Sequence, residues 1–348
     1  MPAPLSAIRT PRPHPDRILR PIPHILAFLV LSLPLLVRAA PPPPSATPPM
    51  PNTARQTSTT ALAGCTHGVV LSIVAHPDDD LLFMNPDQDD AIRQGRCVHT
   101  AYLTAGDRGQ GLDYALARER GIQAAYATMA GTPDAWDTDG LKVGSHTLIR
   151  HRLHAKPGIQ LIMLRLPDPW LGAGWGSLTP LSRVESVPHA RVRSYAPYPD
   201  IYTRSELIQL LADLIRQEHP QDIRLMDPTI TIPYRSLCWR CAGHDHPDHI
   251  AGARLVVAAM ALVPGTYSHT AYLNYPSQAL QANLDAAQTA RKTAIYLRYA
   301  KNDPLTCPPG IDCSVPRGPE AAWVERQYYV RIAAPPLRTG LAQARSGP

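Results

Sequence analysis

The sequence predicts an α/β protein whose mostly parallel sheet is covered by helices on both faces. Short apolar runs such as VVLSIVA (69–75) recur along the chain, as expected of buried strands. Longer segments with apolar residues at helical spacing separate them. Strands that alternate with helices join by right-handed crossovers into parallel sheets. The expected architecture is therefore three-layer α/β/α and Rossmann-like.

The first half of this pattern starts with the strand 69–75, which leads into a polar loop and a short helix at 88–94. The run CVHTAYLTA (97–105) is the next strand, and a glycine-rich loop separates it from a helix at about 114–129. The apolar run 159–166 is a third strand. The stretch 130–200 is rich in glycine, proline and tryptophan, so we expect long loops over the carboxyl end of the strands.

The second half begins with an amphipathic helix at 205–218, for which Ser205 is the expected N-cap. A short strand follows at 223–226 and an apolar helix at 249–262. The pattern ends with a strand at 270–274 and a long helix at 277–299.

The ends of the chain differ in composition from its body. Basic residues precede an apolar run at 25–37 and small residues follow it, which is typical of a signal peptide over 1–39. A Pro/Ser/Thr-rich spacer covers 40–64, a single domain 65–334 and a flexible tail 335–348. We therefore expect a periplasmic or secreted protein with no transmembrane segment after cleavage; an uncleaved signal anchor is the alternative. The net charge of +6 owes much to arginines of the leader, so nucleic acid is not an expected partner.

Six cysteines suit an oxidising compartment. Cys65 and Cys97 each precede an apolar run, so their sulfurs can meet if the two runs are adjacent parallel strands. Cys307 and Cys313 flank a Pro-Pro-Gly turn. Cys238 and Cys241 form a CxxC, for which a structural disulfide is favoured over a redox-active pair or half of a zinc site.

The strongest chemical signal is AHPDDD, which follows the first strand directly. In open α/β sheets, ligands bind outside the carboxyl ends of the strands. His76 and Asp79 can converge on one cation from a tight turn that Pro77 stiffens, and adjacent carboxylates there repel one another unless a cation neutralises them.

A second turn, HDHPDH, opens the helix at 249–262. His246 and His249 repeat the spacing of His76 and Asp79, so this turn can supply a third ligand. Two histidines and a carboxylate with an open fourth position are typical of a catalytic zinc site. Nitrogen and oxygen ligands suit Zn²⁺, although Fe²⁺ takes a similar set.

Five motifs resemble one known family. HPDDDLLFMNPD, YLTAGDRG, ARERGIQAAYATMAG, RLPDP and HPDHIAGARL are similar to the PIG-L/LmbE-like family of zinc-dependent N-acetyl deacetylases, over about residues 66–332. The resemblance implies hydrolysis of the N-acetyl group of an N-acetylglucosamine-type sugar or glycoconjugate.

The resemblance also implies roles for individual residues. His76, Asp79 and His249 are the implied metal ligands, and Asp78 is the implied general base that activates water. His246 matches the histidine that stabilises the oxyanion or protonates the leaving amine, and Asp248 matches the carboxylate that orients it. Arg118 falls at a substrate-contacting arginine, although the helix register there differs from the commonest pattern.

Some questions stay open on the sequence alone. Asp107 lines the pocket or caps its loop, and Trp170 and Trp175 stack on a sugar or pack in the core. Two alternative functions are a carbohydrate-binding protein with a vestigial metal site and a thiol-disulfide protein built on the CxxC. The individual substrate and the oligomeric state are unreadable from the sequence.

Overall fold

The structure is a computed structural model that describes residues 65–332 apart from 170, 173–174, 240 and 266. All described residues belong to one compact unit. The expected signal peptide (1–39), spacer (40–64) and tail (335–348) lie outside the described residues. Within the described part, no helix is both long enough and apolar enough to span a bilayer.

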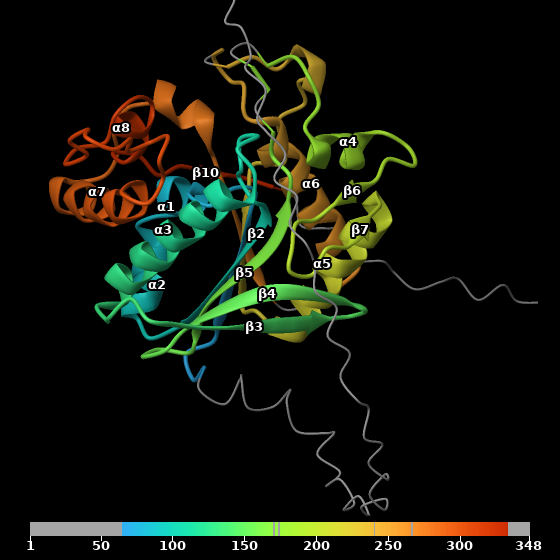
Figure 1. Cartoon of the computed structure of the whole chain (residues 1–348), viewed down its shortest axis with the longest axis horizontal. Coiled ribbons are helices and arrows are strands. Elements are labelled where there is room, and N and C mark those ends of the chain that lie inside the picture. The colour runs from blue at the N-terminus through green and yellow to red at the C-terminus, as the bar shows by residue number, and fades with distance from the viewer. Residues whose placement is uncertain (1–64, 170, 173–174, 240, 266, 333–348) are drawn as a thin grey trace, which may run out of the picture. The chain divides into compact units, whose positions relative to one another are not determined.

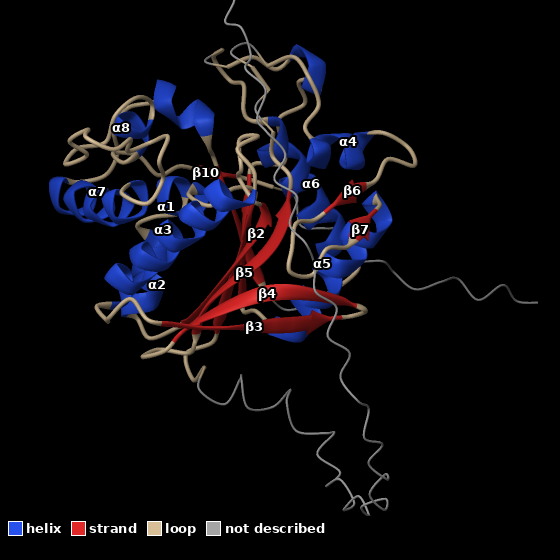
Figure 2. Cartoon of the chain, viewed as in Figure 1, coloured by secondary structure: helices blue, strands red, loops and turns tan. Residues whose placement is uncertain are grey.

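An eight-stranded sheet forms the centre of the described residues (Figure 2). Its order is β10 (Tyr329–Val330), β9 (Ser268–Tyr272), β8 (Asp222–Met226), β1 (Val69–Val74), β2 (Cys97–Thr104), β5 (Ile159–Leu166), β4 (His146–Leu153) and β3 (Trp136–Val143). The five strands from β9 to β5 are parallel, and β10, β4 and β3 run antiparallel to their neighbours. The predicted, mostly parallel α/β fold is confirmed.

Helices pack against both faces of the sheet (Figure 1). One face carries α1 (Asp79–Phe83), α2 (Asp87–Arg93), α3 (Leu112–Ala130), α7 (Ala286–Ala300) and α8 (Glu320–Trp323). The other carries α4 (Pro180–Ser186), α5 (Arg204–Glu218) and α6 (Pro247–Met260). The short elements are β6 (Val192–Arg193), β7 (Ile201–Tyr202), η1 (Tyr234–Ser236) and η2 (Tyr275–Ala279). Each face of the sheet has its own apolar core, which is why its central strands are apolar on both sides.

Two expected secondary-structure elements differ from the structure, and so does one expected N-cap. The stretch 130–200 is not all loop, because β3 and β4 form a hairpin that extends the sheet. Both strands carry polar side chains on their exposed positions, which conceals them beside the apolar central strands. The helix expected at 277–299 is broken, because Asp285 caps a new helix by accepting the N–H of Gln288 at 2.8 Å.

The N-cap of α5 is Thr203 rather than Ser205. The Thr203 hydroxyl accepts the amide of Glu206, whose carboxylate accepts the Thr203 amide at 2.7 Å. This reciprocal pair satisfies two backbone donors at once, so it outcompetes a serine two residues further on.

The three expected disulfides are all present. Cys65 is bonded to Cys97, and the register of β1 and β2 places Val69 opposite Cys97, so the two strand starts are neighbours as predicted. Cys238 is bonded to Cys241 and Cys307 to Cys313.

The topology decides where a site can form. β1 is flanked by β2, which follows it in sequence, and by β8, which comes much later. Chain connections leave β1 and β8 in opposite directions, and such a switch point opens a crevice at the carboxyl ends of the strands. Both histidine turns lie at this edge, one after β1 and the other before α6.

Candidate active site

The first turn is closed by its own side chain. The Asp79 carboxylate accepts the His76 amide at 2.6 Å, and the Asp78 and Asp79 amides both donate to the His76 carbonyl. The turn therefore presents the His76 and Asp79 side chains on the same side, at the end of β1. Both side chains are buried.

The second turn begins α6, with His246 as its N-cap and Pro247 in its first turn. The His249 Nδ1 lies 2.7 Å from an oxygen of the fully buried Asp245, which also accepts the Asn274 amide at 2.9 Å. A carboxylate at this nitrogen holds the proton on Nδ1 and leaves the Nε2 lone pair for another partner.

Ligand-type atoms of three residues meet between the turns, and Asp79 contributes both carboxylate oxygens. His249 Nε2 lies 3.1 Å from His76 Nδ1 and 3.1 Å from Asp79 Oδ1, and His76 Nδ1 lies 3.4 Å from Asp79 Oδ2. In a tetrahedral zinc site with bonds of about 2.0–2.1 Å, neighbouring ligand atoms are about 3.3 Å apart. The three residues thus have the spacing and chemistry that a zinc ion requires.

His246 is a looser candidate ligand. A ring nitrogen of His246 comes within 4.8 Å of nitrogens of His76 and His249. Its Nδ1, however, accepts the Asp248 amide at 3.2 Å. The set formed by His76, Asp79 and His249 is tighter, and we therefore assign the candidate metal position to it.

The carboxylates of Asp168 and Asp248 lie near the second ring nitrogen of His76. Its Nε2 lies 3.5 Å from Asp168 and 3.4 Å from Asp248 and has no hydrogen bond within the described residues. Burial opposes a charge on His76, but Asp79 and Asp168 together hold its pKa well above the usual range. Burial likewise opposes a charge on His249, yet Asp79 and Asp245 raise its pKa to about 9. The field at the centre of the site therefore favours a cation.

Asp78 lines the pocket beside this centre and is held by Arg118, at 2.8 Å. Burial raises the pKa of Asp78, and Arg118 opposes that rise. The Arg118 guanidinium also donates to the carbonyls of Gly106 and Pro77 and to the Tyr299 hydroxyl. A Cβ on Gly106, whose φ is +57°, would lie 2.2 Å from this guanidinium, so the close approach requires glycine.

His246 faces the same pocket. Burial, together with the nearby His76 and His249, keeps its pKa well below the usual value, so the ring is neutral. Because its Nδ1 accepts a backbone N–H, the proton of the neutral ring resides on Nε2. His246 is therefore a hydrogen-bond donor toward the pocket. Asp248 is fully buried, accepts the Thr179 hydroxyl and lies 3.9 Å from His246 Nδ1.

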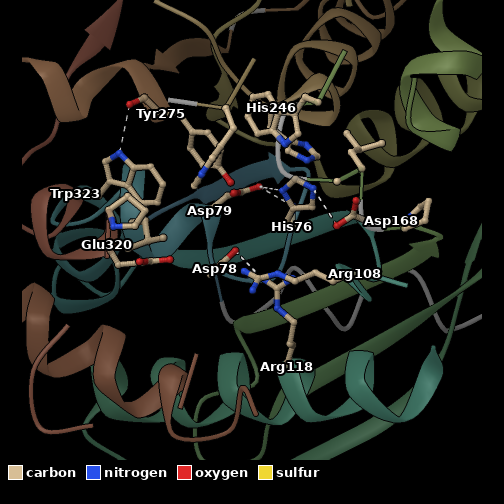
Figure 3. Close-up of a pocket in the computed structure, with 17 residues that line it drawn as sticks. His76, Asp78, Asp79, Arg108, Arg118, Asp168, His246, Tyr275, Glu320 and Trp323 are labelled. Atoms are coloured by element: carbon tan, nitrogen blue, oxygen red, sulfur yellow. Dashed lines mark hydrogen bonds and ion pairs between the residues drawn. The ribbon is translucent and has the colours of Figure 1, made fainter. Parts of the chain in front are cut away.

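The pocket holds about 950 Å³ of empty space, solvent at its mouth included. Figure 3 shows His76, Asp78, Asp79 and His246 on one wall, with Glu320 and Trp323 of α8 nearby. Trp175 and Trp239 lie with ring centroids 5.3 Å apart, and Tyr275 stacks on Trp323 at 4.6 Å. Trp175 thus lines the pocket, whereas Trp170 lies outside the described residues.

The structure brings together most of the predicted site residues. His76, Asp78, Asp79, Arg118, His246, Asp248 and His249 all lie in one cluster. Asp107 is not among the residues that line the pocket, and its contacts match the loop-capping alternative. Its oxygens accept the amides of Asp168 and Gly109 and the Tyr195 hydroxyl, so it supports the loop.

Sequence reasoning gave no role to Asp168 and Asp245. Asp168 follows β5 in the RLPDP motif, and the carboxyl end of a neighbouring parallel strand is a signal that identifies it. Asp245 precedes His249 by four residues, but it lies before the helix begins, so helical spacing does not reveal its contact with that ring.

The model of the PIG-L family, described as GlcNAc-PI de-N-acetylase, matches residues 71–260. No curated protein matches the chain significantly.

Solved structures show more distant similarity. The N,N'-diacetylchitobiose deacetylase of Pyrococcus horikoshii is 15% identical, with 71% of this chain and 74% of that chain covered and a TM-score of 0.39. The zinc-inhibited form of a teicoplanin deacetylase is 12% identical (68% and 86% covered, TM-score 0.40). The 4-carboxy-2-hydroxymuconate hydratase of Pseudomonas putida is 13% identical (74% and 81% covered, TM-score 0.37). Similarities this low assign no activity. The family match spans more than half of the chain and includes both histidine turns, and the chain therefore belongs to the PIG-L family.

Proposed function

We propose that this protein is an exported, metal-dependent deacetylase that removes the N-acetyl group from an N-acetylglucosamine-type sugar or glycoconjugate. The observation that carries the proposal is the convergence of His76, Asp79 and His249 beside Asp78 in a pocket. Membership of a family described by GlcNAc-PI de-N-acetylase supports the reaction.

The metal in this proposal is held by the two histidines and Asp79. When bound there, a divalent ion such as zinc supplies a Lewis acid for the amide carbonyl and makes water more acidic. The three donors suit Zn²⁺, and Fe²⁺ takes a similar set.

In the proposed reaction, Asp78 transfers the proton from water to the leaving nitrogen. Asp78 accepts a proton from the water that attacks the acetamide carbonyl carbon, and its raised pKa suits a base that must later return the proton. As the C–N bond breaks, that proton goes to the leaving nitrogen. Water and the N-acetyl sugar thereby give acetate and the free amine.

His246 and Arg118 support this transfer. The Nε2–H of neutral His246 donates a hydrogen bond to the oxygen that gains negative charge, and such preorganised donors lower the barrier. Asp248 keeps the His246 ring in place through its backbone amide. Arg118 holds Asp78 at 2.8 Å, so that the base stays ionised and aimed at the pocket.

Export is supported by three disulfides, because such bonds persist in oxidising compartments. The apolar run and small residues of the leader support a cleaved signal peptide.

The proposal is tested by metal content and acetate release from N-acetylglucosamine, N,N'-diacetylchitobiose and N,N',N''-triacetylchitotriose. We compare native protein with His249→Ala, Asp78→Asn and the control His154→Ala, which replaces an exposed histidine. His249→Ala should lose the metal, and Asp78→Asn should keep it and lose at least about 100-fold in kcat.

The control variant should match the native protein in both measurements. A native protein that binds no divalent metal would refute the site assignment. A native protein that binds metal and releases no acetate from any of these sugars would refute the substrate class.

A further inference from the structure

Three residues that line the pocket are not used by the proposed reaction. Arg108 comes from the loop after β2, Glu320 from the start of α8 and Trp239 from the loop before α6. Glu320 lies beyond the residues that the family model matches. Two of the three, Arg108 and Glu320, carry a charge that no hydrogen bond or ion pair with another described residue satisfies.

Arg108 is a partly buried cation without a counterion in contact. Within the described residues its guanidinium makes no hydrogen bond and no ion pair, although the neighbouring Arg118 makes both with Asp78 and the backbone. Its backbone φ is +46°, a left-handed conformation that is rare outside glycine. Strained residues of this kind persist where the surrounding structure imposes them, and they cluster at ligand sites.

Glu320 brings the opposite charge to the lining of the pocket. Its carboxylate makes no hydrogen bond or ion pair with another described residue, and it stands near Asp78 (Figure 3). Burial and Asp78 raise the pKa of Glu320, and Arg108 opposes the rise from a distance. The two groups therefore attract each other without a direct contact, and both line the pocket.

Trp239 adds an aromatic surface to the lining of the pocket. Its ring lies 5.3 Å from that of Trp175 and 5.3 Å from that of Tyr275. The Cys238–Cys241 disulfide closes the short loop that carries it. Sugar rings have apolar C–H faces and polar edges, so a rigid aromatic surface beside free hydrogen-bonding groups matches them.

We propose that Arg108 and Glu320 hydrogen-bond the hydroxyl groups of a neutral hexosamine ring whose apolar face packs on Trp239. The pair donates and accepts at once, as vicinal hydroxyls require. These residues determine specificity for a sugar over a small acetylated amine. The assignment of the reacting sugar rests on the proposed function, whereas binding of the sugar does not.

The test uses the zinc-loaded native chain and the variants Arg108→Gln, Glu320→Gln and Trp239→Ala. Arg120→Gln and Glu325→Gln, which replace exposed residues, are the matched controls. Binding of N,N'-diacetylchitobiose is measured by calorimetry, and KM and kcat for this sugar are measured by acetate release. Each pocket variant should raise its Kd and KM about 10-fold or more with kcat within about threefold, because uniform binding is lost. The controls should match the native protein.

Several outcomes would overturn the inference. If native protein releases acetate and the pocket variants keep its KM, the deacetylase activity is supported and the proposed sugar contacts are refuted. If Arg108→Gln weakens only N-acetylmuramic acid, which carries a carboxylate, then Arg108 binds an anion and not hydroxyls. If native protein releases no acetate but binds N,N'-diacetylchitobiose in a manner that depends on Arg108 and Glu320, the sugar contacts are supported and the proposed reaction is refuted.

Discussion

Asp245→Asn tests whether the ligand geometry depends on a residue that is not itself a ligand. The Asp245 carboxylate is fully buried and accepts three hydrogen bonds. They come from His249 Nδ1 at 2.7 Å, the His246 backbone N–H at 2.8 Å and the Asn274 side-chain amide at 2.9 Å. Asparagine keeps the volume and removes the charge.

The expected loss of zinc affinity follows from the way the three donors are divided between the two oxygens of Asp245. Both carboxylate oxygens accept hydrogen bonds, so either orientation of an asparagine side chain turns its NH₂ group toward a donor. Loss of the group that orients a ligating histidine costs about 10–100-fold in metal affinity. We expect the upper end, about 100-fold or about 2.7 kcal/mol, because the His249 ring also loses its negative partner.

The assay is the zinc Kd measured by chelator competition, with thermal unfolding recorded with and without zinc. Asp227→Asn is the matched control, because Asp227 is also buried and follows β8, but its hydrogen bonds go to Thr229. The control should keep zinc affinity within about twofold. A zinc Kd of Asp245→Asn within twofold of native would refute the reasoning.

Three further predictions concern other contacts. Arg118→Gln should keep zinc and lower kcat about 10–100-fold, because Asp78 loses its charge-assisted partner; acetate release and metal content measure this. Lys292→Met should raise the free energy of unfolding at pH 6 by up to about 5 kcal/mol and by much less at pH 10, as measured by urea unfolding. Burial lowers the pKa of Lys292 to about 7 from 10.5, so the folded state binds fewer protons between these values and stability rises with pH across that window. Replacing Cys65 and Cys97 together by serine should cost about 4 kcal/mol, since the bond closes a 32-residue separation; urea unfolding measures this too.

Each of these has a control and a contradicting result. Arg120→Gln should leave kcat unchanged, and a kcat for Arg118→Gln equal to native would contradict the role of its ion pair with Asp78. Lys301→Met, on the exposed end of α7, should leave stability within about 0.5 kcal/mol. A Lys292→Met protein less stable than native at pH 6 would contradict the buried-charge argument. Equal stability of the serine variant and the native protein would contradict the disulfide estimate.

The sequence by itself determined the central parallel strands and the local geometry of the first turn. The central strands could be read because both of their faces are buried, and β5 occurs at the predicted residues 159–166. His76 and Asp79 are three residues apart in a turn that directly follows a strand, so sequence neighbours already place two ligand candidates. The Cys65–Cys97 pairing was a prediction that depended on the adjacency of two parallel strands, and the pairing of β1 with β2 supplies that adjacency.

Only the tertiary structure decided what depends on contacts between distant segments. The hairpin β3–β4 is hidden in the sequence because its outward positions are polar. His246 and His249 are equivalent by spacing, but Asp245 holds the ring of His249, whereas the backbone amide of Asp248 occupies His246 Nδ1. Spacing along a chain constrains neighbours within a turn, whereas the partner of a buried charge comes from whichever segment the sheet and helices bring beside it.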